Sequence, residues 1–503
     1  MATSAAERTG SQVHPVVRML PRDLTPLQAL TAVEREPYTV LFESLGTVDE
    51  GARWTILAFE PAWRLELRGG TLWKLAGGGA VAQPGRGMEA LARMWPARSV
   101  HDGEAPSMSA GPGGANNLPF VSGFAGYLSY DLKDELERYP GKARRESSLP
   151  DLSLGFYDVA WAWDRGSGRG WVVSTGLSEP DPRSREACAE ARLTRQWERI
   201  VGASSAAGGA APPARAAQAP PLGAAVPVRV ESNFTRDGYC RVVERALAHI
   251  AAGDVYQVNL AQRFQLTSAP DPALLFRSLR EESPAPFSAF LTMPGAAIAS
   301  SSPERFFRIE GNRIETWPIK GTRPRGSTPR EDAALASALQ ASAKDRAENV
   351  MIVDLERNDL GRICEIGSVQ VSSLCEVASY ADVHHLVSRV EGTLREDAGP
   401  VDVIRAMFPG GSITGAPKIR AVEIIDTLEP TRRGLYTGAI GYWDVGGACD
   451  FSIAIRTIVV EAGTASFHAG GGIVADSTPE GEYEETLVKA RGMMRSLGVR
   501  WEA

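Results

Sequence analysis

Lys320 lies in the segment Trp317–Gly326, and its setting allows covalent chemistry. The pattern predicts that an apolar, strand-like stretch ends at Gly321, so that the amine is held on short backbone just before the glycine. A lysine amine is a nucleophile only when neutral, so surroundings that lower its pKa would activate it. Taken alone, a surface lysine is the simpler interpretation.

Three glutamates could bind a metal ion. Glu482 and Glu485 are three residues apart on a predicted helix and share one face of it, and Glu348 lies near the end of another predicted helix. Mg²⁺ is usually held by one or two carboxylates together with water and substrate oxygens. Glutamates on helices are more often solvated, so spacing alone indicates a metal site only weakly.

Two features could hold a carboxylate ligand. Gly470, Gly471 and Gly472 follow a strand-like run, and such a glycine-rich turn lets backbone N–H groups approach an anion, although an ordinary tight turn is the alternative. Arg456 lies within the strand-like run Ile453–Thr457, where a charged side chain must find a partner. A ligand carboxylate and an internal Asp or Glu are equally suitable partners.

His384 and His385 are adjacent, so their side chains are expected to point in different directions. One could face a pocket as an acid or base, although a structural role is the simpler interpretation of each. None of the five cysteines lies in a nucleophile-elbow turn, so the sequence shows no glutaminase. If the protein uses ammonia, another chain must supply it.

The composition bounds the class of protein. The 503 residues allow one large or two to three ordinary domains, and the net charge of -7 argues against nucleic acid as a partner. The cysteines are scattered without a CxxC pair, which suits a reducing cytoplasm. We find neither the apolar segment of a signal peptide near the first residue nor an apolar run that could span a membrane, so we expect a cytoplasmic protein without a membrane partner.

The elements that would position these residues lie on both sides of residues 202–227, an Ala-, Gly- and Pro-rich stretch that we interpret as a linker or long loop. Before this stretch, short β-like runs alternate with turns, which favours an antiparallel sheet, and after it helices and strands mix. The predicted strands are Thr39–Phe42, Trp54–Phe59, Arg64–Leu67, Phe156–Trp163, Gly170–Ser174, Val255–Leu266, Gly434–Asp444 and Asp450–Glu461. The predicted helices are one between an N-cap at Thr235 and a stop at Gly253, one over Glu331–Met351 and one over Pro479–Leu497.

Several runs together resemble the chorismate-utilising enzymes, in the order in which that family carries them. They are Ser302–Phe306, Pro318–Thr322, Ala347–Asn349, Val353–Arg362, His385–Val390, Phe408–Lys418, Gly438–Tyr442 and Gly470–Glu485. The first half is similar more loosely, through Leu41–Ser44, Arg53–Ile56 and Gly126–Asp131. The family includes the first components of anthranilate synthase and aminodeoxychorismate synthase, and the isochorismate and salicylate synthases.

The resemblance implies an α+β fold in which two antiparallel β-sheets pack as a sandwich with flanking helices, built from two intertwined subdomains. It also implies three parts of the chain. Residues 1–200 would form an N-terminal region similar to anthranilate synthase component I, residues 201–232 the linker or loop, and residues 233–503 the chorismate-binding catalytic domain.

Two positions separate the reactions of this family. Where isochorismate and salicylate synthases carry a water-activating lysine, this chain has Gln257, which disfavours water as the nucleophile. Anthranilate synthases resemble the segment around Lys320 but carry alanine there, and lysine is typical of the aminodeoxychorismate group. We therefore expect chorismate and ammonia to give 4-amino-4-deoxychorismate through a covalent adduct on Lys320. This is an amino-group transfer of the transaminase class, and anthranilate synthase component I is the alternative.

The resemblance also implies the roles of individual residues. Lys320 would be the nucleophile and Glu304 the general acid that helps the hydroxyl leave. Thr322 and His385 would line the pocket beside them. Tyr436, Arg456, Gly470, Gly471, Gly472 and Lys489 would bind the substrate, and Glu348 and Glu485, with Glu482 close by, would bind Mg²⁺.

Two further partners follow from the resemblance. A separate glutamine amidotransferase subunit should supply ammonia, because fused versions need a longer chain. The segment with Glu43 and Ser44 would line a tryptophan pocket, and the sequence leaves open whether tryptophan binds or regulates. A non-catalytic amino-acid sensor is a rival from another class, but the expected catalytic residues are all present.

Overall fold

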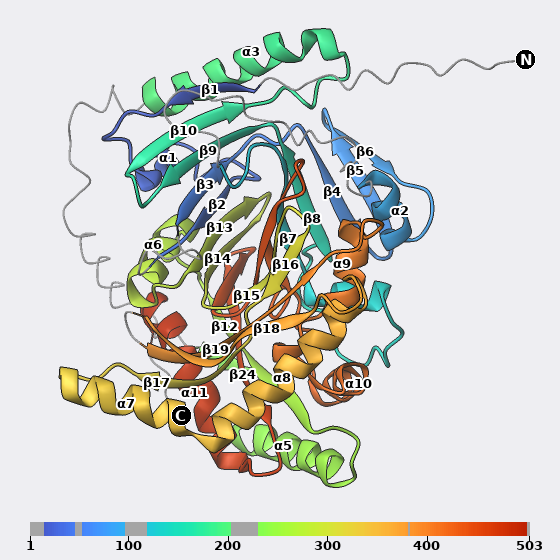
Figure 1. Ribbon diagram of the computed structural model, residues 1–503, viewed down its shortest axis with the longest axis vertical. Helices are drawn as coiled ribbons and strands as arrows, with labels where there is room; N and C mark the ends of the chain where they lie inside the picture. Colours follow the sequence, from blue (N-terminus) through green and yellow to red (C-terminus); the bar gives the residue numbers. More distant parts are fainter. Residues whose placement is uncertain (1–14, 46–52, 96–117, 203–229, 381–382, 500–503) are drawn as a thin grey trace, which may run out of the picture.

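The structure, a computed structural model, describes residues 15–45, 53–95, 118–202, 230–380 and 383–499. Within these residues, two antiparallel sheets of twelve strands each pack against one another, and helices flank them (Figure 1). The predicted sandwich of two antiparallel sheets with flanking helices is confirmed.

The elements have the following bounds. The first sheet runs in the order β1 (Val16–Met19), β10 (Arg169–Ser174), β9 (Val159–Asp164), β3 (Trp54–Ala58), β2 (Val40–Glu43), β13 (Phe287–Met293), β14 (Ala296–Ser302), β23 (Thr457–Glu461), β24 (Thr464–Ile473), β12 (Gln257–Thr267) and β11 (Val230–Ser232), with β20 (Gly415–Ala416) beside β12. The second runs β17 (Ile319–Pro324), β19 (Val383–Thr393), β16 (Arg313–Thr316), β15 (Arg305–Glu310), β22 (Cys449–Ile453), β21 (Ala439–Asp444), β7 (Gly123–Leu128), β8 (Leu152–Tyr157), β4 (Trp63–Arg68), β5 (Thr71–Ala76) and β6 (Gly79–Ala82), with β18 (Gln370–Ser379) beside β19. The main helices are α1 (Pro26–Thr31), α2 (Gly87–Met94), α3 (Arg185–Trp197), α5 (Arg236–Ala251), α6 (Pro272–Glu282), α7 (Pro329–Ala341), α8 (Ala343–Gly361), α9 (Pro400–Met407), α10 (Lys418–Leu428) and α11 (Pro479–Ser496).

Both sheets combine strands from the two sides of the predicted linker. In the first sheet β2 pairs with β13, and in the second β7 pairs with β21. A buried apolar cluster between the sheets joins residues of both regions, such as Ile56, Tyr127, Leu291 and Ile440. Residues 203–229 of the predicted linker lie outside the described part, and the assignment of separate roles to residues 1–200 and 233–503 stays a prediction.

Three elements that were each predicted as one are two separate elements in the structure. The run Phe156–Trp163 is two strands, β8 and β9, which belong to different sheets, and the chain passes from one sheet to the other at Asp158. The single helix predicted over Glu331–Met351 is two helices, because Ser342 has ψ 108 and its hydroxyl accepts from the N–H of Asp345 to cap α8. The run Asp450–Glu461 is β22 and β23, with Arg456 at φ 49 between them.

The helix ends follow ordinary capping rules. Thr235 caps α5 as predicted, accepting from the N–H of Gly238 at 3.1 Å. Pro479 stands in the first turn of α11, where no backbone donor is needed, and Thr478 caps that helix. Within the described residues, no helix is long and apolar enough to cross a membrane.

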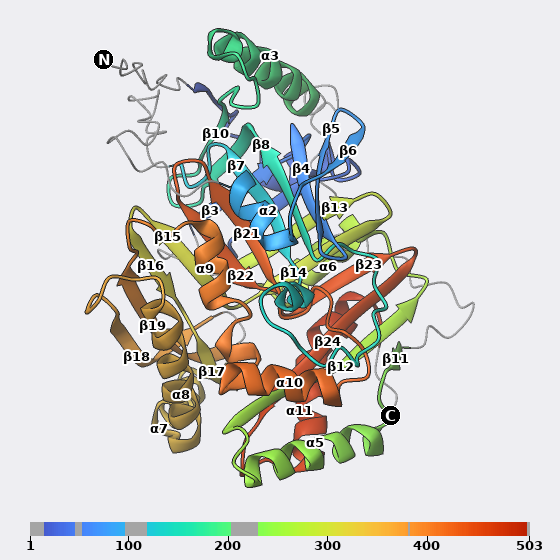
Figure 2. The ribbon, with the colours of Figure 1, turned by 90° about the vertical axis from the view of Figure 1, so that its right-hand side faces the viewer.

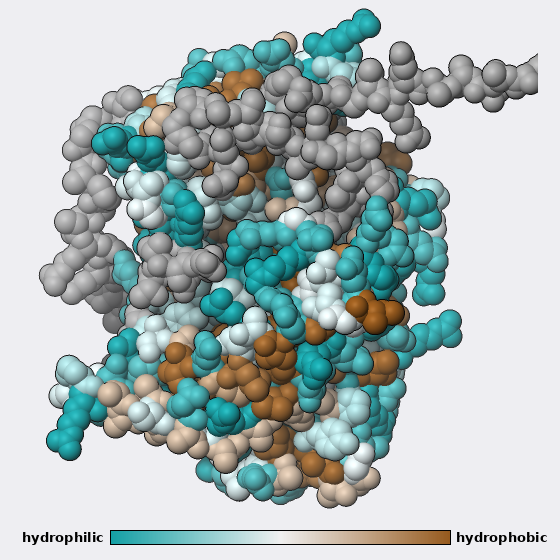
Figure 3. All heavy atoms as spheres, viewed as in Figure 1, coloured by the Kyte–Doolittle hydropathy of each residue, from teal (hydrophilic) through white to brown (hydrophobic). Residues whose placement is uncertain are grey.

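Helices lie at both ends of the sheets and along their sides (Figures 1 and 2). Figures 1 and 2 both place α3 at one end and α5 at the other, with α7, α8, α10 and α11 towards the α5 end. Figure 3 shows a mainly hydrophilic face on which hydrophobic side chains gather around α8 and β18, where Val350 is 39% and Leu374 46% exposed. Helix α8 packs against β17, which carries Lys320, and α11 packs against β24, which carries Gly470, Gly471 and Gly472.

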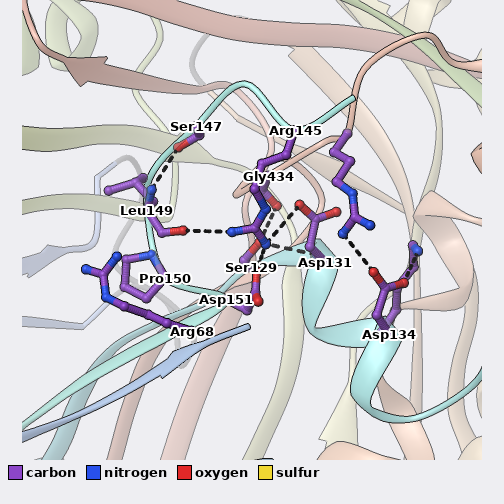
Figure 4. A network of polar contacts seen from close by, with 12 residues as sticks. Arg68, Ser129, Asp131, Asp134, Arg145, Ser147, Leu149, Pro150, Asp151 and Gly434 are labelled. Carbon is purple, nitrogen blue, oxygen red and sulfur yellow. Dashed lines mark hydrogen bonds and ion pairs between the residues drawn. The ribbon is translucent and has the colours of Figure 1, made fainter. Parts of the chain in front are cut away.

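A polar network ties the N-terminal region to the segment before Tyr436 (Figure 4). Arg145 forms ion pairs with Asp151 and, at 3.9 Å, with Asp131. The hydroxyl of Ser129 donates to the carbonyl oxygen of Gly434 at 2.7 Å. Burial raises the pKa of the Asp131 carboxyl to about 6, with nearby arginines and Lys133 opposing the rise. The network fixes the backbone on which the predicted carboxylate-binding Tyr436 stands.

Candidate active site

Lys320 lies on β17, which does not end at Gly321 as predicted. The strand continues with a bulge between Lys320 and Thr322, and Gly321 supplies the bulge with φ 80. A Cβ on Gly321 would also come within 2.9 Å of the Asp345 side chain, so a larger residue would both strain the backbone and push on α8. The bulge therefore changes the direction in which the Lys320 side chain leaves the backbone. It does so where β17 contacts α8.

The Lys320 amine is half-buried and donates to the carbonyl oxygen of Ser412 at 3.0 Å. Burial lowers the pKa of Lys320, the charge of Lys489 lowers it further, and the carboxylates of Glu304, Glu348 and Glu485 oppose the fall. A lowered pKa raises the fraction of neutral amine at a given pH, which is the reactive form. The geometry thus suits the predicted nucleophile.

Glu304 lies between β14 and β15 and is only 5% exposed. Burial raises the pKa of its carboxyl, while the Ser412 hydroxyl, the charge of Lys320 and the N–H of Ile319 lower it. A carboxyl whose pKa is raised can keep a proton for a leaving group. Ser412 contacts both residues, through its carbonyl to Lys320 and through its hydroxyl to Glu304.

Ser412 is the residue of the candidate site that sequence reasoning missed. It lies in the loop Phe408–Lys418, which resembles the family but in which no residue was assigned a role from the sequence. The Asn259 side chain also donates to the Ser412 carbonyl at 3.0 Å, and Arg433 donates to the next carbonyl, that of Ile413, at 3.0 Å. These bonds fix the loop, so the lysine and the glutamate meet a rigid partner.

His385 and His384 point in different directions, as expected. Nδ1 of His385 shares a hydrogen bond of 2.9 Å with the Thr322 hydroxyl, whereas His384 contacts Ser379 and Asp332. Burial and then the charge of Arg456 lower the pKa of His385 to about 3, so the ring is neutral at physiological pH. Its Nε2 is buried without a hydrogen-bond partner in the described structure. A neutral imidazole ring of this kind can orient a substrate group, but it does not carry the extra proton that a charged imidazolium could donate.

The carboxylates meet around Gly471. A Cβ on that glycine would lie 3.1 Å from Glu482 Oε2 and 3.2 Å from Glu485 Oε1, so both carboxylates of α11 face this glycine. Glu348 of α8 and Glu485 each contribute to the electrostatic field at Lys320, which places all of them around one region. Burial raises the pKa of Glu348 and of Glu482.

Lys489 occupies part of this acidic region. Its amine lies 2.7 Å from Glu485 Oε1 and donates to the carbonyl oxygen of Gly470 at 2.9 Å. Burial acts to raise the pKa of Glu485, but the charge and hydrogen bond of Lys489 outweigh it and hold the pKa below its usual range. Lys489 thus keeps Glu485 ionised.

The carboxylates fit a hard cation that is completed by other ligands. No three Asp, Glu, His or Cys side chains in the described ranges are placed as a closed coordination sphere. Mg²⁺ does not need one, because it commonly takes one or two carboxylates and fills its other positions with water and substrate oxygens. The absence of a Cβ at Gly471 leaves space beside Glu482 and Glu485 for such a ligand.

The three glycines lie within β24 and not in a turn after it. They pair with Ala261, Leu260 and Asn259 of β12, and a Cβ on Gly470 would lie 2.3 Å from the Leu260 carbonyl oxygen. Close approach of the strands is therefore one reason for glycine here. The pairing of β24 with β23 ends at Phe467, so in the described sheet the later residues are paired on one edge only. Alternate N–H groups of the other edge remain available, and their binding of a carboxylate stays a prediction.

Arg456 is not on a strand, contrary to the expectation. It lies in the connection from β22 to β23 with φ 49, and its carbonyl oxygen accepts from the N–H of Ser301 at 3.1 Å. Its charge is felt at His385, which brings it to the same side of the molecule. The conformation of this connection, and not that of a strand, therefore sets the direction of the Arg456 side chain.

Tyr436 is held by aromatic and cationic neighbours. Its ring stacks on His468 at a centroid distance of 4.9 Å, and Arg433 lies 5.7 Å from the ring centre. Arg433 in turn forms a buried ion pair with Glu429 at 2.7 Å. Since Arg433 also binds the Ile413 carbonyl, one side chain links Tyr436 to the loop beside Lys320.

Gln257 begins β12 and is fully buried. Its amide nitrogen donates to Asn259 at 2.9 Å, and Asn259 in turn binds Ser412. An amide cannot take up a proton as a lysine amine would, so this position supports the framework and offers no base for water.

Glu43 and Ser44 line a separate cleft between the sheets. Its walls combine the aromatic residues Phe42, Trp54, Phe287 and Tyr442 with the polar residues Arg305, Arg308 and Asp450. The Glu43 carboxylate is held by two hydrogen bonds from Arg280, at 2.6 and 2.9 Å. The predicted residues thus do come together in a cleft.

The family model of chorismate binding enzymes matches residues 49–495. The chain belongs to this family. An aminodeoxychorismate synthase of Streptomyces griseus is 46% identical over 75% of this chain, which spans only 50% of that protein's length. The Escherichia coli aminodeoxychorismate synthase component 1 is 43% identical over 76% of this chain and 78% of its own length, and a Haloarcula marismortui anthranilate synthase component 1 is 41% identical over 76% and 77%.

The fold is also found in a solved structure. Anthranilate synthase component I of Streptococcus pneumoniae superposes with a TM-score of 0.71 at 28% identity, over 97% of this chain and 100% of that one. Relatives of both amination reactions are therefore close in sequence, and identity alone does not separate the two products.

Proposed function

We propose that the chain is the chorismate-converting component of an aminodeoxychorismate synthase, which makes 4-amino-4-deoxychorismate from chorismate and ammonia on the route to 4-aminobenzoate and folate. The observation that carries the proposal is the Lys320 amine, half-buried with a lowered pKa and sharing Ser412 with the acid Glu304. The names of several relatives agree with it.

The proposed reaction has two displacements. The neutral Lys320 amine bonds to an alkene carbon of the ring near the hydroxyl-bearing carbon, the ring double bonds shift, and the C–O bond breaks as the hydroxyl leaves as water with a proton from Glu304. The new ammonium group then returns a proton to the Glu304 carboxylate. Ammonia then bonds to the carbon that lost the hydroxyl, the double bond shifts, and the bond to Lys320 breaks to restore the amine. Formally an amino group is transferred from glutamine once the partner's glutaminase is included, which is the transaminase class of the prediction.

The remaining substrate contacts are part of the proposal. Tyr436, Arg456 and the open edge of β24 would hold one carboxylate of chorismate, with Lys489 next to them. Neutral His385, fixed by Thr322, would face the ring with its free Nε2. The buried polar atom that lacks a protein partner is consistent with a ligand contact.

We also propose Mg²⁺ as the cofactor, held by Glu348 and Glu485 with Glu482 close by. When bound, the ion would neutralise a substrate carboxylate. Chelation with EDTA should abolish turnover and added Mg²⁺ should restore it, because the acidic region would otherwise repel the substrate. Glu485→Gln should raise the Mg²⁺ concentration needed for half-maximal activity, whereas Glu484→Gln, a neighbour on the same helix, should not. Full activity of the chelated enzyme would contradict the metal assignment.

A separate glutamine amidotransferase subunit is the proposed source of ammonia, in line with the component 1 names of the relatives. The cytoplasm is the proposed compartment, and the five free cysteines suit its reducing conditions.

Tryptophan is the proposed ligand of the cleft with Glu43 and Ser44, because aromatic walls and polar groups alternate there. Thermal unfolding with tryptophan and with alanine tests this. Tryptophan alone should raise the melting temperature, and equal curves would remove it as a ligand.

The product assay decides the main proposal. Incubation with chorismate, Mg²⁺ and an ammonium salt should yield a product that an aminodeoxychorismate lyase converts to 4-aminobenzoate. Anthranilate fluorescence as the main signal, independent of the lyase, would instead identify an anthranilate synthase component.

A further inference from the structure

The loop Phe408–Lys418 rests directly on α8. Gly411 passes so close that a Cβ would lie 2.6 Å from the Leu355 side chain and 3.2 Å from Glu356 Oε1. The next residue, Ser412, is the one that contacts Lys320 and Glu304. Whatever fixes Gly411 against α8 therefore fixes the partner of both reacting groups.

Glu356 makes that connection from the interior. Its side chain is 2% exposed, and its Oε1 accepts from the N–H of Gly411 at 3.2 Å. Its other oxygen, Oε2, is buried and has no hydrogen-bond partner among the described residues. A charged carboxylate in this position would be poorly compensated, since a buried ion normally needs a partner.

Lys418, whose charge acts on Glu356, already has other partners. Lys418 pairs with Asp359, one turn further along α8, and also donates to the carbonyl oxygen of Met407 at 2.9 Å. Asp359 is 3% exposed, so two buried carboxyl groups share one ammonium group. Only one of them can be ionised without leaving an unbalanced charge, and the lysine is bonded to Asp359.

We propose that Glu356 is a positioning residue that acts in its neutral, protonated form, holding Gly411 so that Ser412 stays between Lys320 and Glu304. The reaction that it serves is the proposed amination of chorismate. Glu356 touches no reacting group itself. It acts through the backbone N–H of Gly411. If Glu356 lost its proton, a second negative charge would lie beside that of Asp359 and next to the loop Phe408–Lys418.

The groups around Glu356 act on its pKa in both directions, and those that raise it prevail. Burial, the charge of Asp359 and the charge of Glu304 raise its pKa, and Lys418 and the N–H of Gly411 oppose them, with a balance of about 8. At pH 7 the carboxyl is therefore mostly protonated, and it ionises as the pH rises through 8. Because the pKa in the folded protein exceeds the ordinary 4.5, its contribution to stability is full below pH 4.5 and is lost as the pH rises to about 8.

Glu356→Gln tests the proposal, because glutamine keeps the acceptor for Gly411 and cannot ionise. The ratio of kcat for this variant to kcat for the wild type should rise about tenfold between pH 7 and pH 9, as the wild type loses its neutral form. The melting temperature of the variant should also gain on that of the wild type between pH 5 and pH 8. Asp354→Asn is the matched control, since Asp354 lies on the same helix with 64% of its side chain exposed, and its ratio should stay flat.

Glu356→Leu provides the second arm, because leucine removes the acceptor. It should lower kcat with little change in the KM for chorismate, since Gly411 loses its anchor while the carboxylate-binding residues remain. A flat pH ratio for Glu356→Gln, or a wild-type kcat for Glu356→Leu, would overturn the proposal. Chorismate consumption is measured together with product identity, so a different product would contradict the proposed function and leave the pH comparison to judge Glu356.

Discussion

Lys320→Ala should lower the formation of 4-amino-4-deoxychorismate by at least about 100-fold, because Lys320 is the amine that, among the described residues, lies beside the acid Glu304 with a lowered pKa. Lys489, the other lysine in the region, is bonded to Glu485 and the Gly470 carbonyl. Lys320→Arg should be equally inactive, since guanidinium keeps the charge but stays protonated. The measurement is 4-aminobenzoate released in the presence of excess lyase.

The covalent step has its own readout. When ammonia is withheld, intact-protein mass spectrometry should show the wild type carrying the mass of chorismate less water, and Lys320→Ala should not carry it. Lys142→Ala, at an exposed lysine away from the site, serves as the control and should behave like the wild type. An unchanged yield from Lys320→Ala would refute the covalent step even if the product were right. In the wild type, the rate of adduct formation should rise with pH through the lowered pKa of Lys320.

Glu304→Gln should lower kcat by about 10²- to 10⁴-fold, the usual range for loss of a general acid. The amide can still accept from the Ser412 hydroxyl, so the loop should stay in place and chorismate should still bind. The wild type should lose activity at high pH as the raised pKa of Glu304 is passed, because the hydroxyl then has no proton donor. Glu304→Gln should lack the part of this fall that comes from Glu304 and should keep the part that comes from ionisation of Glu356.

Stopped-flow measurement of chorismate binding separates a loss of catalysis in Glu304→Gln from a loss of substrate binding. Glu310→Gln, at an exposed acid on neighbouring β15 that pairs with Arg308, is the matched control and should retain wild-type kcat. If Glu304→Gln kept more than about a tenth of the wild-type kcat, another group would have to be the acid.

The residues of the candidate site could be named from the sequence because their types carry chemistry and their order is that of a family. The sequence segments around Lys320 and Glu304 were enough to identify both residues, and both lie beside Ser412 in the structure. Ser412 itself could not be found in this way. It acts through a backbone carbonyl, which every residue has, and only the folded loop shows which one meets the lysine.

The errors of element assignment have a common cause in local backbone conformation. Gly321 at φ 80 turns a predicted strand end into a bulge, and Arg456 at φ 49 turns a predicted strand interior into a connection. A positive φ is uncommon at residues other than glycine, and the spacing of apolar residues carries no information about where it occurs. Similarly, Ser342 stands inside a helical pattern and becomes a cap only because its own hydroxyl binds the next turn.

The pairing of β2 with β13 and of β7 with β21 has a consequence for how the chain can be divided. A fragment that begins after residue 230 would keep the whole set of candidate catalytic residues but would expose two unpaired strand edges. Open edges of this kind invite pairing with other chains, so such a fragment should aggregate rather than catalyse. Since these pairs join residues more than two hundred positions apart, the native sheets cannot close until most of the chain has been made. Supplying the missing N-terminal piece as a second polypeptide, which restores β2 and β7, is therefore the practical route to a soluble catalytic half.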